Sequence, residues 1–417
     1  MTLNFITFDF RHIIMADIIP FKATRPTPDK APLVTTLAYD EYSATELASW
    51  LDFNPFSFLH IINPAYVNQQ KIGIEQRFRI VAAKYKDFKR DKIFIQDDAP
   101  AYYLYRITSR DYNFIGIMAG TSIEDYKLQR IKKHENTLDY RVSALRDYFK
   151  ISGFNTEPVL MMYPNHNDLD NWIENYQNNT PIYDFTTTNK QKHTVWKIDN
   201  QADIDYITET FKGFEHLYIA DGHHRSAASE MIHDEDPQNP LLHYFMSYLV
   251  SEKSIRINEY NRVIHDLNGY SAEEFLTLLE EDFILKPRKQ QLWKPSQKFE
   301  FGMYLNNIYY SLKLKNIPEN KEGLESLDAQ ILYDKILHKI LGIGDLRTDS
   351  RIDYIPGNQS VIEMFKKIDN GEYEVGFTLF PPSIEEIKYL AHNDLTMPPK
   401  STYIEPKLRN GLMIYEF

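Results

Sequence analysis

The sequence predicts a mixed α/β protein of the α+β type, and three kinds of pattern support that fold class. Pairs of apolar runs joined by polar turns predict β-hairpins over 101–119 and over 298–314. Apolar residues recur at helical spacing over 75–86, which predicts an amphipathic helix. A short apolar run over 217–221 passes through Asp-Gly into an alanine-rich segment, which predicts a strand, a tight turn and a helix.

The length and composition of the chain set the scale of this fold. With 417 residues, including 25 Phe and 29 Tyr, the chain can bury a substantial core but is too long for a single simple one. We expect two or three domains, or one domain with large insertions. Residues 1–14 are expected to be an annotation extension or a disordered tail, because they lack the basic start of a signal peptide and Met15 is a more natural beginning.

The first expected segment, 15–125, mixes helices and strands. Turn-forming residues separate its apolar runs, so each run is expected to be a separate short element. The expected elements are a helix over 44–51, a strand over 56–62 ended by Asn63-Pro64, a helix over 75–86, and hairpin strands over 101–107 and 114–119.

The second expected segment, 126–250, carries the turn after residue 221. Thr137 is a plausible N-cap for the first helix of this segment, and Gly153 is expected to end that helix. The expected elements are a helix over 138–150, a buried strand over 158–163, a polar insertion over about 164–192, a strand over 195–198, and a helix over 203–211.

The third expected segment, 251–417, ends in a proline-punctuated tail. The tail over 397–407 is expected to be extended and to fold back onto the ligand-binding cleft at the turn after residue 221. Lys400 is predicted to neutralise phosphate charge there. The expected elements are a strand over 254–257, a helix over 272–281, a hairpin over 298–314, a helix over 328–341 followed by Gly342-Ile343-Gly344-Asp345 with Arg347 and Arg351, and a terminal strand over 411–417.

Charge and cysteine content narrow the function classes. A formal net charge of −12 argues against a general nucleic-acid binder, which normally presents a basic face. The sequence contains no cysteine, which excludes disulfides, thiolate metal sites and a cysteine nucleophile. No run is apolar for long enough to cross a membrane, so a cytoplasmic protein that binds no membrane is expected.

The segment 217–228 carries the clearest chemistry in the sequence. Its strand–turn–helix pattern would point the backbone N–H groups of a helix N-terminus at a bound phosphate. Gly222 allows a ligand to approach the backbone closely, and Arg225 can offer a planar donor fork to phosphate oxygens. Asp221 follows the strand directly, where a catalytic or metal-bound carboxylate commonly lies.

Two alternatives to phosphate binding remain for this segment. Asp221, His223 and His224 have side chains that suit a zinc or iron site. Adjacent histidines nevertheless lack the i, i+4 spacing that places two ligands on one helix face. The other alternative is a purely structural turn, in which at least one histidine caps or packs.

Several motifs together resemble the domain-of-unknown-function family ten-fifteen. The resemblance covers essentially all of the chain from Met15 onward. The segments that carry it are Asn54-Pro55-Phe56-Ser57-Phe58-Leu59-His60, Lys133-His134-Glu135-Asn136-Thr137, Ile219-Ala220-Asp221-Gly222-His223-His224-Arg225, Tyr260-Asn261-Arg262-Val263 and Met397-Pro398-Pro399-Lys400-Ser401-Thr402-Tyr403.

The order of these motifs is also similar to the ParB and sulfiredoxin-like superfamily, in particular its free L-serine kinases. The resemblance implies a nucleotide-binding core of that type, embedded between N-terminal and C-terminal α/β segments. It implies catalytic roles for Glu135 and Asp221, with His134 beside them, and Asp221 as the metal ligand. It assigns His223, His224 and Arg225 to the nucleotide phosphates. The expected cofactor-binding residues also include Gly222 and Ser226 of the turn and Lys400 of the tail.

The resemblance favours a kinase that uses ATP or ADP with Mg²⁺ and phosphorylates a small hydroxyl metabolite, with free L-serine as the favoured acceptor. Two other hypotheses are a nucleotide-binding switch of the ParB type that binds no DNA, and a metal-dependent hydrolase. A homodimer is possible under each of them. Two departures from the resembled pattern are Lys133 in place of proline and the run Arg141-Val142-Ser143-Ala144-Leu145 in place of a more charged run.

Overall fold

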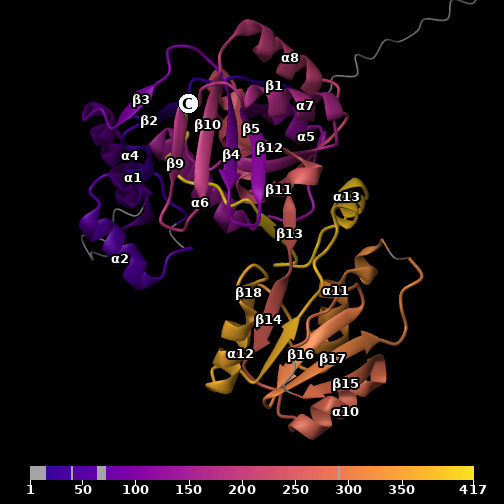
Figure 1. Ribbon diagram of the computed structural model, residues 1–417. Coiled ribbons are helices and arrows are strands. Elements are labelled where there is room, and N and C mark those ends of the chain that lie inside the picture. The colour runs from indigo at the N-terminus through magenta and orange to yellow at the C-terminus, as the bar shows by residue number, and fades with distance from the viewer. Residues whose placement is uncertain (1–15, 39–40, 63–71, 290–291, 321) are drawn as a thin grey trace, which may run out of the picture.

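Two β-sheets organise the described chain, and its C-terminal tail returns from the second sheet to the first (Figure 1). The prediction of a mixed α/β protein is confirmed. Residues 1–14, expected to be an extension or tail, lie outside the described residues. The structure, a computed structural model, describes residues 16–38, 41–62, 72–289, 292–320 and 322–417.

The first sheet has nine strands among the described residues, in the order β6-β11-β8-β12-β5-β4-β10-β9, with β1 paired to β5. Two pairs, β11 with β6 and β12 with β8, are parallel, and the other pairs are antiparallel. The expected hairpin is present as β4 and β5. The strands are β1 Ile18–Ile19, β4 Tyr102–Thr108, β5 Asn113–Ser122, β6 Ile131–Lys132, β8 Val159–Tyr163, β9 Tyr183–Thr186, β10 Lys192–Ile198, β11 Leu217–Asp221 and β12 Tyr244–Ser251.

Both faces of this sheet are covered, because successive residues of a strand point to opposite faces. Met161 of β8 packs with α5, α7 and α8 on one face, whereas Leu160 and Met162 pack with the C-terminal tail on the other. The tail is therefore part of the core. The covering helices are α5 Ile123–Lys127, α7 Asn167–Tyr176 and α8 Gln201–Phe211.

Two helices flank the edge of the sheet near residue 221. Val142 and Phe149 of α6 pack against Ala228 and Ile232 of α9. Helices α1, α3 and α4 and strand β3 pack around Phe154 of β7 beside this pair. The elements are α1 Ala31–Val34, α2 Ala44–Phe53, α3 Leu59–Ile62, α4 Ile74–Arg90, α6 Asp139–Ser152, α9 His223–Glu235, η2 Pro240–His243, β2 Thr24–Pro26, β3 Phe94–Gln96 and β7 Phe154–Asn155.

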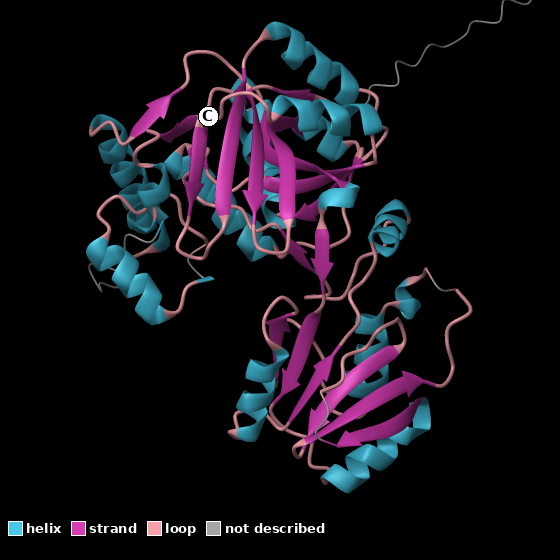
Figure 2. Cartoon of the chain, in the orientation of Figure 1, coloured by secondary structure: helices cyan, strands magenta, loops and turns pink. Residues whose placement is uncertain are grey.

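The second sheet is antiparallel, with six described strands in the order β15-β17-β16-β19-β14-β18. Helices α10 and α11 cover one face and α12 covers the other (Figure 2). The elements are β14 Tyr260–Ile264, α10 Ala272–Asp282, β15 Phe283–Lys289, β16 Glu300–Leu305, β17 Ile308–Leu314, η4 Leu324–Ser326, α11 Asp328–Leu332, η5 Tyr333–His338, β18 Ile352–Pro356, α12 Val361–Asp369 and β19 Val375–Thr378.

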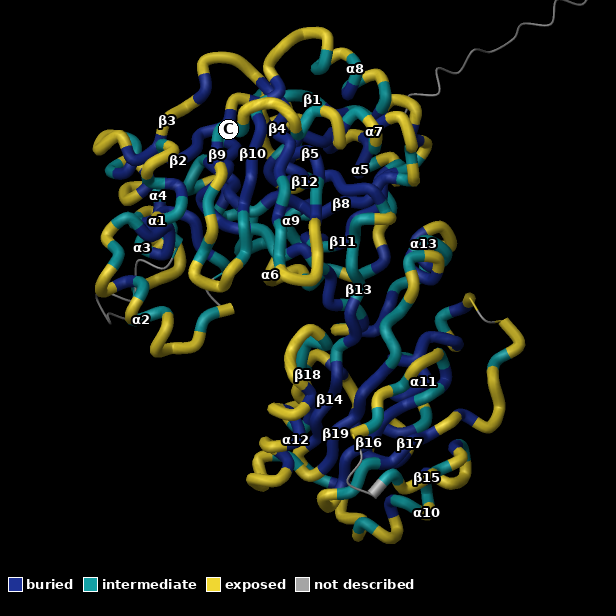
Figure 3. Tube along the Cα trace, in the orientation of Figure 1, coloured by how far each residue is buried: buried dark blue, intermediate teal, exposed yellow. Residues whose placement is uncertain are grey.

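Two crossings connect the sheets. The chain enters the second sheet through η3 and β13, and it returns through α13 and β20, which pairs with β13 (Figure 1). Along the crossings, buried and partly buried residues alternate with exposed ones (Figure 3). The connecting elements are η3 Glu252–Ser254, β13 Arg256–Asn258, α13 Ile384–His392, β20 Tyr403–Glu405 and β21 Tyr415–Glu416.

Four expected elements differ from the structure. The expected strand over 56–62 is wrong, because Phe58 accepts backbone hydrogen bonds from Ile61 and Ile62 and the segment ends as helix α3. The polar insertion over 164–192 contains α7 and β9. The expected strands over 254–257 and 411–417 are reduced to β13 and to the two residues of β21.

None of the helices in the described parts of the chain has the length and apolar character needed to cross a lipid bilayer.

Candidate active site

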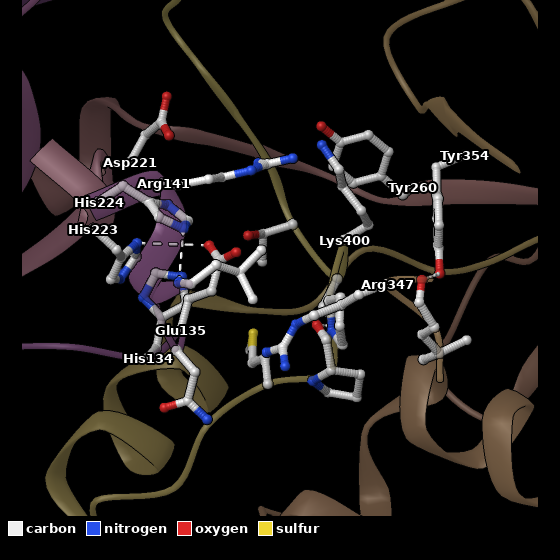
Figure 4. A pocket seen from close by; sticks show the side chains of 18 of the residues that line it. His134, Glu135, Arg141, Asp221, His223, His224, Tyr260, Arg347, Tyr354 and Lys400 are labelled. Atoms are coloured by element: carbon white, nitrogen blue, oxygen red, sulfur yellow. Dashed lines mark hydrogen bonds and ion pairs between the residues drawn. The ribbon is translucent and has the colours of Figure 1, made fainter. Parts of the chain in front are cut away.

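A cavity of about 860 Å³ lies between the two sheets (Figure 4). Its walls come from the start of α6, the turn from β11 to α9, the tail over 397–407, and the loop before β18. Its size falls within the range of about 300–1,000 Å³ that is usual for small-molecule sites. Residues far apart in sequence therefore meet in one place of suitable size for a ligand.

The turn at Gly222 shapes one wall of the cavity. Gly222 has a φ of 103°, a left-handed conformation that other residues adopt only with strain. A Cβ at this position would lie 3.0 Å from Cζ of Arg225. Helix α9 begins at the next residue with no side chain capping its N-terminus. Its first N–H groups are thus available to an anion in the way the sequence predicts.

Asp221 ends β11 and lies between two cations. Its carboxylate is 3.0 Å from Nζ of Lys407 and 3.6 Å from Nη2 of Arg225. Burial raises the pKa of Asp221, but the attraction of Lys407 and Arg225 outweighs it and holds the pKa well below its usual range. Asp221 is therefore an ionised carboxylate whose charge is already compensated.

The guanidinium of Arg225 already has partners within the protein, so it is not a free donor group waiting for a phosphate. Its Nη1 donates to the carbonyl of Pro158, and its Nε lies 3.9 Å from Oε2 of Glu157. The guanidinium still lines the cavity. The Arg225 side chain therefore stabilises the cavity wall at least as much as it offers hydrogen bonds to a ligand.

Glu135 projects into the cavity from the loop before α6 (Figure 4). Its Oε2 lies 3.6 Å from Nδ1 of His223. Burial raises the pKa of Glu135, and the nearby charge of Asp221 raises it further, while Lys400 and Arg347 act in the opposite direction. A carboxyl group in this environment can exchange a proton closer to neutral pH than an exposed glutamate.

His134 and His223 form a buried pair behind Glu135. Their ring centroids are 4.6 Å apart in an edge-to-face arrangement. Burial lowers the pKa of His134 to about 4 and lowers that of His223 well below its ordinary value. Both imidazoles are neutral at pH 7, so His223 can contact a ligand as a hydrogen-bonding group but adds no positive charge.

His224 has a role that the sequence does not suggest. Its Nε2 accepts a hydrogen bond of 3.1 Å from the backbone N–H of Leu138, at the start of α6. The expected cap, Thr137, is therefore replaced: Leu138 occupies the N-cap position and has no capping side-chain bond of its own. Because Nε2 accepts, the proton of the neutral ring lies on Nδ1. His224 ties α6 to α9 and still lines the cavity.

Ser226 is not brought to the cavity. It is buried, and its hydroxyl donates to the carbonyl of Gly222 at 3.3 Å, inside the first turn of α9. The sequence assigned it to phosphate because it follows the turn directly. Helical geometry instead directs its side chain away from the ligand wall.

Lys400 lies on the tail wall of the cavity (Figure 4). Its φ of 55° is left-handed, and Nη2 of the buried Arg262 donates to its carbonyl at 3.1 Å. Its Nζ lies 5.1 Å from the centre of the Tyr260 ring. The backbone N–H of Met397 also donates to the carbonyl of His134 at 2.9 Å, which fastens the tail beside Glu135.

Three cations of the lining lack a carboxylate ion pair within the part of the chain that the structure describes. They are Arg141 on α6, Arg347 on the loop before β18, and Lys400 on the tail. Sequence reasoning assigned a role to Lys400 alone. The sequence feature that could have drawn attention to Arg347 is the glycine-containing turn before it, Gly342-Ile343-Gly344-Asp345. For Arg141 the only such feature is that its segment departs from the run of the resembled family.

The cavity offers one candidate metal ligand, Asp221, and no preformed metal site among the described residues. Within the described ranges, no three His, Asp or Glu side chains are grouped to hold a metal ion. Mg²⁺ bound together with a nucleotide does not need such a group, because it commonly takes one or two carboxylates and completes its shell with phosphate oxygens and water. Asp221, ionised at the cavity wall, fits that requirement.

Comparison with known protein families extends this description. The profile of DUF1015, a protein family of unknown function, matches residues 18–330. The chain belongs to this family. The match includes the His134-Glu135 segment and the Asp221 turn, but the loop of Arg347 and the tail of Lys400 lie beyond it. No protein of curated function matches the sequence significantly.

Among solved structures, the chain is similar to a mutant of a free serine kinase in complex with AMP, with a TM-score of 0.38 and 14% identity over 72% of this chain and 92% of that one. C-terminally truncated SbnI from Staphylococcus aureus matches with a TM-score of 0.38 and 13% identity, over 72% and 87% of the two chains. A conserved hypothetical protein from Pyrococcus furiosus matches with a TM-score of 0.34 and 12% identity, over 72% and 94%.

Proposed function

We propose that this protein is a nucleotide-dependent phosphotransferase that phosphorylates a small hydroxyl metabolite, with free L-serine as the favoured acceptor and O-phosphoserine as the product. The observation that carries the proposal is the meeting of Glu135 with the uncapped N-terminus of α9 in one cavity. The first can accept a proton and the second can bind a phosphate. A phosphotransferase needs both in one place.

The nucleotide phosphates are proposed to lie against Gly222, His223 and the first N–H groups of α9. Positive charge for them comes from Lys400 and Arg141, which have no carboxylate partner in the described chain. Mg²⁺, with Asp221 as its candidate protein ligand, would neutralise further phosphate charge when bound. The donor is ATP or ADP, since either presents a terminal phosphoryl group to the same turn.

In the proposed reaction, the acceptor hydroxyl oxygen forms a bond to the terminal phosphorus. The bond between that phosphorus and the bridging oxygen breaks, and ADP leaves when ATP is the donor, or AMP when ADP is. The hydroxyl proton passes to Glu135, whose raised pKa suits a base that is later regenerated. His223, 3.6 Å from Glu135, helps to orient the carboxylate.

A metal-dependent hydrolase built on Asp221, His223 and His224 is not proposed. The Nε2 of His224 accepts from the N–H of Leu138, and His223 is buried behind Glu135. These contacts direct the two imidazoles to different partners. Among the described residues, these side chains form no group of three that could hold a metal ion.

The proposal is tested by incubating the purified protein with Mg²⁺ and either ATP or ADP, together with free amino acids and small alcohols, and by identifying products by mass spectrometry. The expected result is O-phosphoserine formed in proportion to nucleotide consumed. Nucleotide hydrolysis that no acceptor stimulates would favour the switch hypothesis. If the protein binds no nucleotide and phosphorylates no acceptor, the proposal is rejected.

A further inference from the structure

Arg347 stands on a loop that is built to hold it in place. The Oδ1 of Asp345 accepts from the backbone N–H of Arg347 at 2.9 Å, and the carbonyl of Asp345 accepts from Thr348 and Asp349. The hydroxyl of Tyr354, on β18, donates to the carbonyl of Leu346 at 2.8 Å. The loop is thus held internally through Asp345 and is fixed to the second sheet through Tyr354.

The neighbouring Arg351 shows the contrast. Its guanidinium donates to the carbonyls of Leu341 and Gly342, each at 3.0 Å, and forms an ion pair with Asp349. Its Nη1 also lies 3.7 Å from Oδ1 of Asp266, so Arg351 is tied to its surroundings on several sides and is a structural residue. The guanidinium of Arg347 has no such hydrogen bond or ion pair with a described residue, although the residue lines the cavity.

Arg347 extends from the second sheet toward Glu135 of the opposite wall (Figure 4). The two side chains are close enough for the charge of Arg347 to act on the pKa of Glu135. The N-terminus of α9 lies on the same wall as Glu135. A ligand between the walls therefore meets Arg347 on one side, and the α9 N-terminus together with the proposed base Glu135 on the other.

We propose that Arg347 binds the carboxylate of the acceptor, so that the substrate is a hydroxy amino acid or similar hydroxy acid and not a simple alcohol. This inference rests on the proposed function. A guanidinium matches a carboxylate with two parallel hydrogen bonds, which a lysine cannot reproduce. With the carboxylate held at the second sheet, the hydroxyl of a three-carbon acid is directed toward Glu135 and the nucleotide.

The test compares L-serine with ethanolamine, which is serine without its carboxylate, in the wild type and in Arg347→Gln, with Arg347→Lys as the conservative variant. Arg110→Gln is the matched control, because Arg110 is exposed in the β4–β5 turn and lines no part of the cavity. We expect Arg347→Gln to lower kcat/KM for serine by about 10- to 100-fold, as for a lost charge-assisted hydrogen bond. Ethanolamine turnover and nucleotide affinity should change less than about threefold.

Equal losses for serine and ethanolamine would overturn the inference, and so would weaker nucleotide binding with an unchanged ratio of the two acceptors, which would assign Arg347 to a phosphate. A calorimetric titration separates this inference from the proposed function. If the wild type phosphorylates nothing, yet Arg347→Gln weakens binding of O-phospho-L-serine and not of O-phosphoethanolamine, the reaction is rejected and the carboxylate site stands. If O-phospho-L-serine binds equally to both proteins, the carboxylate site is rejected.

Discussion

Lys407 and Asp221 form an ion pair of 3.0 Å although they are 186 positions apart in the chain. The pair joins the tail to the end of β11, next to the turn that begins α9. Through this pair, Lys407 of the C-terminal tail compensates the negative charge of Asp221, which lies near the middle of the chain. The folding of the tail and the state of the cavity are therefore linked.

Lys407→Met is expected to destabilise the fold at neutral pH by about 0.5–1 kcal/mol, because both side chains are partly exposed and solvent screens the pair. The native pKa of Asp221 lies below its unfolded value, so its contribution to stability is present above the unfolded pKa of about 3.9 and is lost as pH falls below it. The loss caused by the substitution should therefore shrink in acid.

Urea unfolding of both proteins between pH 7 and pH 3 measures this effect. Lys212→Met, which removes an exposed pair with Glu209 on α8, is the control. A difference between the wild type and Lys407→Met that stays constant over the whole pH range would contradict the role of Asp221.

Glu135→Gln is expected to lower kcat by at least about 100-fold, because an amide cannot accept the hydroxyl proton. Nucleotide affinity should stay within about twofold, since the phosphates are proposed to bind at α9. Stopped turnover assays and nucleotide titration measure the two quantities, with the exposed Glu209→Gln as the control. Unchanged turnover would remove Glu135 from the mechanism.

Lys400→Met is expected to move the acidic limb of the kcat/KM profile to higher pH. Lys400 lowers the pKa of Glu135 against the effects of burial and Asp221, so its removal lets that pKa rise and leaves less of the base ionised in mild acid. Activity should therefore fall more at pH 6 than at pH 8. Lys92→Met is a matched control, because Lys92 has the same φ of 55° and lies outside the cavity. A parallel loss at every pH would assign Lys400 to binding alone.

Gly222→Ala is expected to destabilise the protein by about 1–2 kcal/mol through left-handed backbone strain, and also to weaken nucleotide binding because the new Cβ meets Arg225. Gly269→Ala separates the two effects. Gly269 has a φ of 82° and no atom within 4 Å of the added Cβ, so it should show the strain without the loss of affinity. Equal nucleotide affinity in both variants would argue against a ligand at the α9 turn.

Much of the fold follows from local sequence patterns. The β4–β5 hairpin, the strand–turn–helix at 217–235 and the helix after residue 138 are present where periodicity and turn residues predict them. The segment over 56–62 shows the limit of this approach. Its apolar residues suit a buried strand or a short buried helix equally well, and the core around Phe58 and Ile61 determines which one forms.

The sequence alone determined the chemical character of the site: a flexible Gly222 between a buried strand and a helix, an adjacent Asp221, and a His-Glu segment elsewhere in the chain. Such features depend on neighbouring residues and are visible without a structure. Only the tertiary structure decided that His224 accepts from Leu138, that Lys407 pairs with Asp221, and that Arg347 faces Glu135. These partners are brought together by the packing of the tail and of the second sheet, and long-range packing leaves no periodic signal in the sequence.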